Sequence, residues 1–97
     1  MFRSNTAIPT PNASLYLKKL CKHFQHKIEA PYTDTEGTAC FPMGTGVFVA
    51  SDTQLNIACS ADTREALEKV QWIIDDHLIR FARKEGLQWR WIAFAMD

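Results

Sequence analysis

The chain has 97 residues, of which eleven are basic and eleven acidic, so its formal net charge is zero, and 46% of its residues are hydrophobic. That hydrophobic fraction excludes an intrinsically disordered chain, and the length is enough for one domain with one modest core. Because no excess of either charge exists, we expect no nucleic-acid partner and no anionic membrane surface.

The cysteines and the hydropathy of the chain indicate the cellular compartment in which the protein is expected. The three cysteines, Cys21, Cys40 and Cys59, form no CxxC pair, so neither a zinc knuckle nor a thioredoxin-like site is predicted. Cys21 and Cys59 fall on predicted buried faces, which suits free thiols in a reducing compartment. No apolar run is long enough to span a membrane, and no apolar signal-peptide core begins the chain. We therefore expect a cytoplasmic protein.

The N-terminal residues 1–9 are expected to form a loose arm or, over residues 5–8, a short edge strand. Thr10 and Pro11 then mark a helix start, with threonine as the cap and proline at the first helical position. The predicted helix runs to about His26. Its inward stripe, at helical spacing, comprises Ala13, Leu17, Leu20, Cys21 and Phe24.

Four short runs with alternating apolar residues follow, at residues 28–32, 39–41, 48–50 and 55–59. Because short turns separate them, we expect an antiparallel meander. Apolar residues also alternate onto the far side of this sheet, where they could form a patch that binds a partner or a small apolar ligand; they are Cys40, Val47, Val49 and Ala58.

A second, longer helix is predicted within residues 62–86. Asp62 followed by Glu65 is a variant of the capping box, and Gly86 suits a left-handed turn at the helix end. The buried stripe comprises Leu67, Val70, Ile74, Leu78 and Phe81. His77 lies at the margin of this stripe, with Arg80 three residues further on.

Together these elements predict a single domain over residues 10–86 of the α+β class. The expected architecture is a two-layer sandwich with the order (β)-α-β-β-β-β-α, in which a four-stranded antiparallel meander carries two helices on one face.

The last segment, residues 87–97, is unusually apolar, and an exposed tail of this composition needs a docking surface. Trp72 and Ile79 project from the side of the second helix opposite its core stripe. We expect the tail or a partner subunit to cover them, and a homodimer is one expectation. The predicted interface comprises Trp72, Ile79, Trp89, Trp91 and Phe94.

Two segments carry a resemblance to a known bacterial family. Residues 20–27 read LCKHFQHK and residues 77–82 read HLIRFA, and both resemble signatures of the bacterial domain of unknown function 2218. The lead-in at Tyr16 and Leu17 and the hairpin from Gly44 to Ala50 also fit. The resemblance implies a small α+β domain, similar in layout to TATA-binding-protein-like folds, without an established activity. For some members it also implies an iron-uptake or siderophore context. Fold similarity does not transfer DNA binding.

All three histidines lie in these two segments. If the helices pack side by side, His23 and His77 flank the groove between them, and His23, His26 and His77 could bind zinc, copper or iron, with Asp76 as a further ligand. An anion site is the second interpretation, with Lys22, Lys27, Arg80 and His23 holding a carboxylate or phosphate. In the third, His77 bonds to a backbone carbonyl, His23 and His26 face solvent, and Arg80 pairs with Asp76.

Motifs of catalysis are absent from the sequence. It has no Ser-His-Asp spacing, no paired-carboxylate motif and no phosphate-binding glycine loop, and Cys21 lies on an inward stripe where thiols are generally inert. The sequence therefore favours a non-catalytic module that binds a small anionic or metal-bearing ligand between the helices. The alternative is a protein-interaction or homodimerisation domain whose histidines are structural.

Overall fold

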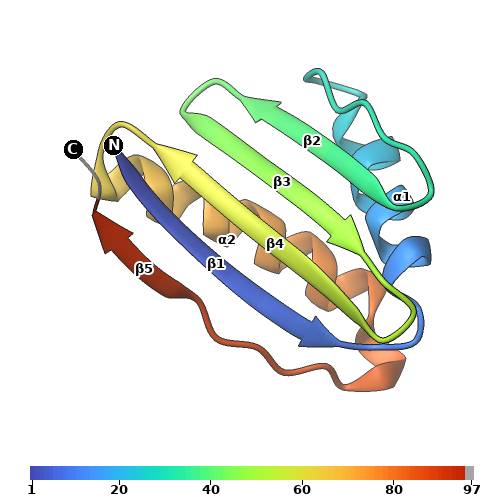
Figure 1. The fold of residues 1–97 in the computed structure, drawn as a ribbon. Helices are drawn as coiled ribbons and strands as arrows, with labels where there is room; N and C mark the ends of the chain where they lie inside the picture. Colours follow the sequence, from blue (N-terminus) through green and yellow to red (C-terminus); the bar gives the residue numbers. More distant parts are fainter. Residues whose placement is uncertain (96–97) are drawn as a thin grey trace.

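The computed structural model describes residues 1–95, with side chains described through residue 92. Its elements are β1 (Phe2–Pro9), α1 (Ala13–Phe24), β2 (Glu36–Phe41), β3 (Gly44–Ala50), β4 (Gln54–Ala61), α2 (Arg64–Phe81), the 3-10 helix η1 (Arg83–Glu85) and β5 (Ile92–Ala95). The strands form one antiparallel sheet in the order β2-β3-β4-β1-β5, and both helices cover the same face of it (Figure 1). The predicted α+β class, with two helices on one face of an antiparallel sheet, is confirmed. Met96 and Asp97 of the predicted tail lie outside the described residues.

The N-terminal segment is a full strand inside the sheet. β1 pairs with β4 along its whole length and with β5 over Phe2 to Asn5. Ser4, Thr6 and Ile8 are buried and alternate with exposed residues, so one side of the strand faces the helices. Two of these three positions are polar, and this weak apolar alternation is why the sequence suggests only an arm or a short edge strand.

Residues 28–32, expected as the first strand of the meander, contribute only isolated bridges from Glu29 to Cys40 and from Tyr32 to Gly37. The backbone N–H of Ile28 is already used, because it donates to the Phe24 carbonyl at 3.0 Å. Pro31 has no N–H to donate. This segment therefore lies beside β2 without forming a continuous ladder, and the meander consists of β2, β3 and β4.

Helix ends differ from the predicted ones by one to four residues. α1 begins at Ala13 after Asn12, so Thr10 is not its cap and Pro11 is not its first residue. Thr63, not Asp62, is the cap of α2, and its hydroxyl accepts the N–H of Ala66 at 3.0 Å. The α-helical hydrogen bonds of α2 stop at Phe81, and the 3-10 turn η1 carries the chain on to Gly86. As predicted, Gly86 has a left-handed conformation, with φ 61°.

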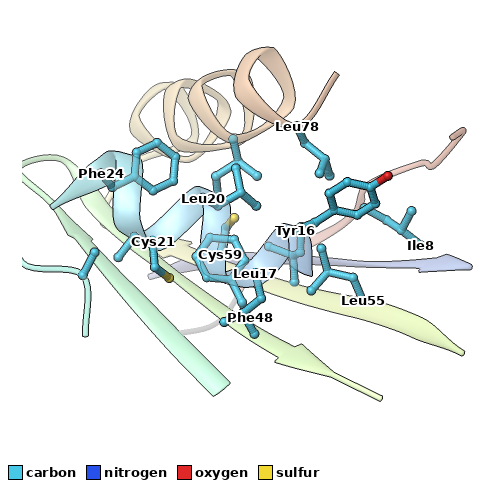
Figure 2. Close-up of a cluster of buried hydrophobic side chains, with 14 of the residues drawn as sticks. Ile8, Tyr16, Leu17, Leu20, Cys21, Phe24, Phe48, Leu55, Cys59 and Leu78 are labelled. Carbon is cyan, nitrogen blue, oxygen red and sulfur yellow. The ribbon is translucent and has the colours of Figure 1, made fainter. Parts of the chain in front are cut away.

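A single core lies between the sheet and the two helices (Figure 2). Phe48, Leu55 and Ile57 from the sheet are fully buried or nearly so, as are the stripes of both helices except Phe81, which is partly buried. Gly37 lets β2 pass close beneath α1, because a Cβ at this position would lie 2.7 Å from the Cys21 sulfur. The amphipathic stripes read from the sequence therefore define the two layers.

The C-terminal segment docks on the same chain. After Gly86 it runs back along β1, where the Thr6 hydroxyl donates to the Arg90 carbonyl at 2.8 Å, and it then adds β5 as an edge strand. The indoles of Trp89 and Trp91 donate to the Asp75 carboxylate at 2.7 and 3.0 Å. No helix in the described part of the chain has the length and apolarity to cross a membrane.

Candidate histidine pocket

The three histidines come together where the end of α1 packs against the middle of α2. The imidazole centroids of His23 and His77 are 4.6 Å apart, and those of His23 and His26 are 6.0 Å apart. The expected proximity of His23 and His77 across the helix–helix groove is thus observed. His26 joins them because the backbone tightens at the end of α1, where its N–H bonds to the His23 carbonyl at 3.2 Å in an i−3 pattern.

Aromatic rings continue this cluster toward the sheet. The Phe24 ring lies edge-on to both His77 and Phe41, with each pair of centroids 5.1 Å apart. Phe81 lies edge-on to His23 on the other side, at 6.0 Å. Such edge-to-face contacts fix ring orientations as well as burying area. These contacts form an aromatic wall that holds the half-buried His77 and one side of the exposed His23, while His26 is exposed beside it.

Beside this wall lies a cavity of about 520 Å³ between the end of α1, the middle of α2 and the β2–β3 turn. Its lining is mostly apolar with a basic margin, and comprises His23, Phe24, His26, Lys27, Ile28, Phe41, Pro42, Met43, Ile73 and His77. This volume and composition are typical of sites for small molecules.

Hydrogen bonding fixes one imidazole of the wall. His77 Nδ1 lies 2.7 Å from the Ile73 carbonyl, which can only accept, so Nδ1 donates a hydrogen bond to it. This is the backbone-bonded state given by the third sequence interpretation.

Electrostatics act on His23, whose pKa lies below the usual 6.5. Partial desolvation is the first cause, and the charges of His77, His26, Arg80 and Lys27 add to it. His23 therefore takes up its proton at a lower pH than an ordinary histidine.

Two of the predicted anion ligands lie outside the cavity lining. Lys22 is exposed on α1, and Arg80 is exposed on α2, where it forms an ion pair with Asp76 at 3.0 Å. Lys27 does line the cavity. No group of three His, Cys, Asp or Glu side chains within the described residues is arranged to hold a metal ion, so the predicted site of His23, His26 and His77 is not formed.

The buried thiols are not suited to nucleophilic chemistry. Burial raises the pKa of Cys21 to about 11, and burial together with the nearby Asp75 raises the pKa of Cys59 to about 12. Both thiols are therefore protonated at neutral pH, which agrees with the expectation that Cys21 is inert.

Residues of the predicted interface are separated by the fold. Trp72 and Ile79 remain 66% and 59% exposed, so the described part of the tail does not cover them, contrary to one of the two expectations. Trp89 and Trp91 are partly buried against the core and bond to Asp75 instead. The tail pairs with β1 because an edge strand satisfies its backbone, which side-chain contact with α2 alone would not. The side chain of Phe94 lies outside the described residues.

Sequence reasoning missed most of the apolar lining, namely Ile28, Phe41, Pro42, Met43 and Ile73. Ile28 and Phe41 belong to the predicted runs 28–32 and 39–41, and Pro42 and Met43 fall in the short turn after the second of these runs. A turn with two apolar residues, Pro42 and Met43, is the one signal that could have indicated a covered surface there.

The fold and the cavity define a small, two-layer α+β domain with one histidine-lined apolar pocket. The chain belongs to the family described as "Uncharacterized protein conserved in bacteria (DUF2218)", whose model matches residues 5–92. It is similar to the NMR structure of PA4090 from Pseudomonas aeruginosa, with 30% identity and a TM-score of 0.81, covering 95% of this chain and 96% of that one. No protein of curated function matches it.

Proposed function

We propose that this domain is a non-catalytic module that binds a small amphipathic anion, with an apolar body and one carboxylate or phosphate group, in the histidine pocket between α1 and α2. The observation that carries the proposal is the composition of the cavity, which combines an aromatic and aliphatic lining with imidazoles and one lysine at its margin. Pockets of this kind use the apolar lining for affinity and a few polar groups for orientation.

An anion fits this margin better than a cation or a bare metal ion. Lys27 supplies a positive charge, and His23 and His26 supply imidazoles that can donate hydrogen bonds. No acidic residue belongs to the lining. The apolar body of the ligand would lie against Phe24, Phe41 and Met43.

Benzoate is a suitable probe because it pairs a flat apolar ring with one carboxylate. We expect it to shift the backbone amide signals of residues 23–28, Phe41 and Met43 in a two-dimensional NMR titration. Lys27→Gln should weaken this binding about threefold to tenfold, since it removes one charged hydrogen-bond donor. Lys22→Gln, on α1 five residues before Lys27 and outside the cavity lining, is the matched control and should leave the affinity unchanged. Shifts confined to the open face of the sheet would contradict the proposal.

Binding should also depend on pH through His23. A bound anion favours the cationic imidazole, so benzoate affinity should rise as pH falls below about 6.5 and His23 takes up a proton. The charges that oppose this protonation come from His77 and Arg80 on α2 and from His26 and Lys27 at the end of α1. In the variant His23→Ala the rise should be reduced, and benzamide, the neutral analogue, should show no such rise. A pH-independent affinity would exclude His23 from the site.

A further inference from the structure

No described helix or strand covers the face of the sheet opposite the two helices (Figure 1). At its centre Val47 and Val49 are 39% and 42% exposed, and Ile92 on β5 is 64% exposed. Antiparallel sheets that face water usually carry polar residues on that side. Apolar residues clustered on adjacent strands instead indicate an interaction surface.

This open face has a ridge and a hollow side by side. Val47 and Val49 project from β3, whereas the small residues Ala58 and Ala7 lie on β4 and β1. The hollow above these strands has a volume of about 660 Å³, and Ile92 lines its far side. A ridge of two valines beside a hollow is a shape that a second copy of the same face could complement.

The charged residues of the open face also differ between its two sides. Glu36 lies on the edge strand β2, and the sheet register places it in one row with Val49, Asn56 and Ala7. At the other end of the hollow lies Arg90, just before β5. An acidic group therefore occupies one side of the surface and a basic group the other.

We propose that the open face is a homodimer interface, in which a second copy packs face to face about a twofold axis that runs along the central strand β4. Such a rotation reverses the order of the strands and keeps each residue's position along them. The valine ridge of one copy then enters the hollow of the other, with Val49 over Ala7. Glu36 then faces Arg90 of the second copy, and the same contacts recur by symmetry.

A second copy is favoured over an unrelated partner because shape and charge are each self-complementary under one operation. The size of the surface also indicates how tightly two copies should associate. Five strands spaced about 4.8 Å apart give a face of roughly 20 Å by 20 Å, which places the interface at the small end of specific contacts. We therefore expect a reversible dimer that forms in the micromolar range or above.

Sedimentation velocity of the full chain over a micromolar to millimolar range tests the proposal. We expect a concentration-dependent shift from monomer to dimer, which Val47→Lys abolishes and which Glu36→Arg or Arg90→Glu weakens about tenfold. The double variant Glu36→Arg with Arg90→Glu should restore association, because it exchanges the two charges. Trp72→Ala, on the exposed side of α2, is the control and should dimerise normally.

Thiol labelling gives a second readout. Cys40 lies on β2 and is exposed, whereas Cys21 and Cys59 are buried, so a maleimide should react first with Cys40. Its labelling should slow as the concentration rises through the dimerisation range, and it should not slow in Val47→Lys. A monomer at every concentration would overturn the proposal. So would a dimer that survives Val47→Lys or that Trp72→Ala disrupts. None of these results bears on benzoate binding, which occurs on the other side of the sheet.

Discussion

Replacing Asp75 with alanine is expected to lower the free energy of unfolding by about 2–4 kcal/mol. The Asp75 carboxylate accepts hydrogen bonds from two indoles, Trp89 at 2.7 Å and Trp91 at 3.0 Å. Hydrogen bonds to a charged acceptor are worth about 1.5–3 kcal/mol each, and relief of the half-buried charge offsets part of the loss. Because both tryptophans belong to the segment that leads into β5, that segment should loosen first.

Chemical denaturation followed by circular dichroism measures the loss, and tryptophan fluorescence reports on the released segment. Asp76→Ala is the matched control, since Asp76 is adjacent and forms only a surface ion pair with Arg80. Such pairs contribute about 0–1 kcal/mol. Equal losses in the two variants would show that the bonds to the indoles do not hold the segment.

The Asp75 carboxylate should also make the free energy of unfolding depend on pH. Burial raises the pKa of Asp75 above its usual value, and the indole hydrogen bonds only partly counter this. A carboxyl whose folded-state pKa is raised adds stability below its unfolded-state pKa, and this contribution is lost as pH rises through the folded-state pKa. Relative to Asp75→Asn, which does not titrate, the wild type should therefore gain stability as pH falls toward 4.

Removing the Glu85 side chain should destabilise the fold by a similar amount, about 2–4 kcal/mol. Its carboxylate accepts from the Thr10 hydroxyl at 2.9 Å, from the Asn12 side chain at 3.0 Å and from the Tyr16 hydroxyl. Thr10 and Tyr16 are only 3% and 5% exposed, so Glu85→Ala would leave two buried hydroxyls without this acceptor. An unsatisfied buried hydroxyl costs about 1–3 kcal/mol.

Urea denaturation of Glu85→Ala, Glu85→Gln and Glu68→Ala separates this role from a general charge effect. Gln keeps one acceptor oxygen and should lie between alanine and the wild type. Glu68 is exposed on α2, and its loss should change stability by no more than about 0.5 kcal/mol. If Glu85→Ala matched Glu68→Ala, the carboxylate would not link the start of α1 to η1.

Local patterns in the sequence are sufficient to predict the two helices, the strands β2, β3 and β4, and the histidine side of the pocket. The stripes of the two helices and Gly86 after the second depend on local geometry, so they are readable without tertiary contacts. The start of α1 at Ala13, two residues after Pro11, departs from the prediction. The flanking positions of His23 and His77 follow from the same periodicity, and their 4.6 Å separation is observed. The switch to i−3 bonding at the end of α1, which the sequence does not show, brings His26 to the pocket.

The sequence by itself therefore determined the α+β class and which helix faces are buried, because 3.6-residue and two-residue periodicities are properties of short segments. Only the tertiary structure decided that residues 2–9 form an interior strand and that the tail adds β5. The hydrogen bonds of Asp75 to the tail and of Glu85 to the start of α1 are likewise visible only in the tertiary structure. Pairing of β1 with β4 and β5, and of Glu85 with Thr10, joins residues more than forty positions apart. The physical reason is that hydrogen bonds across such distances are chosen by the packed fold as a whole, and no local pattern records which carboxylate will meet which donor.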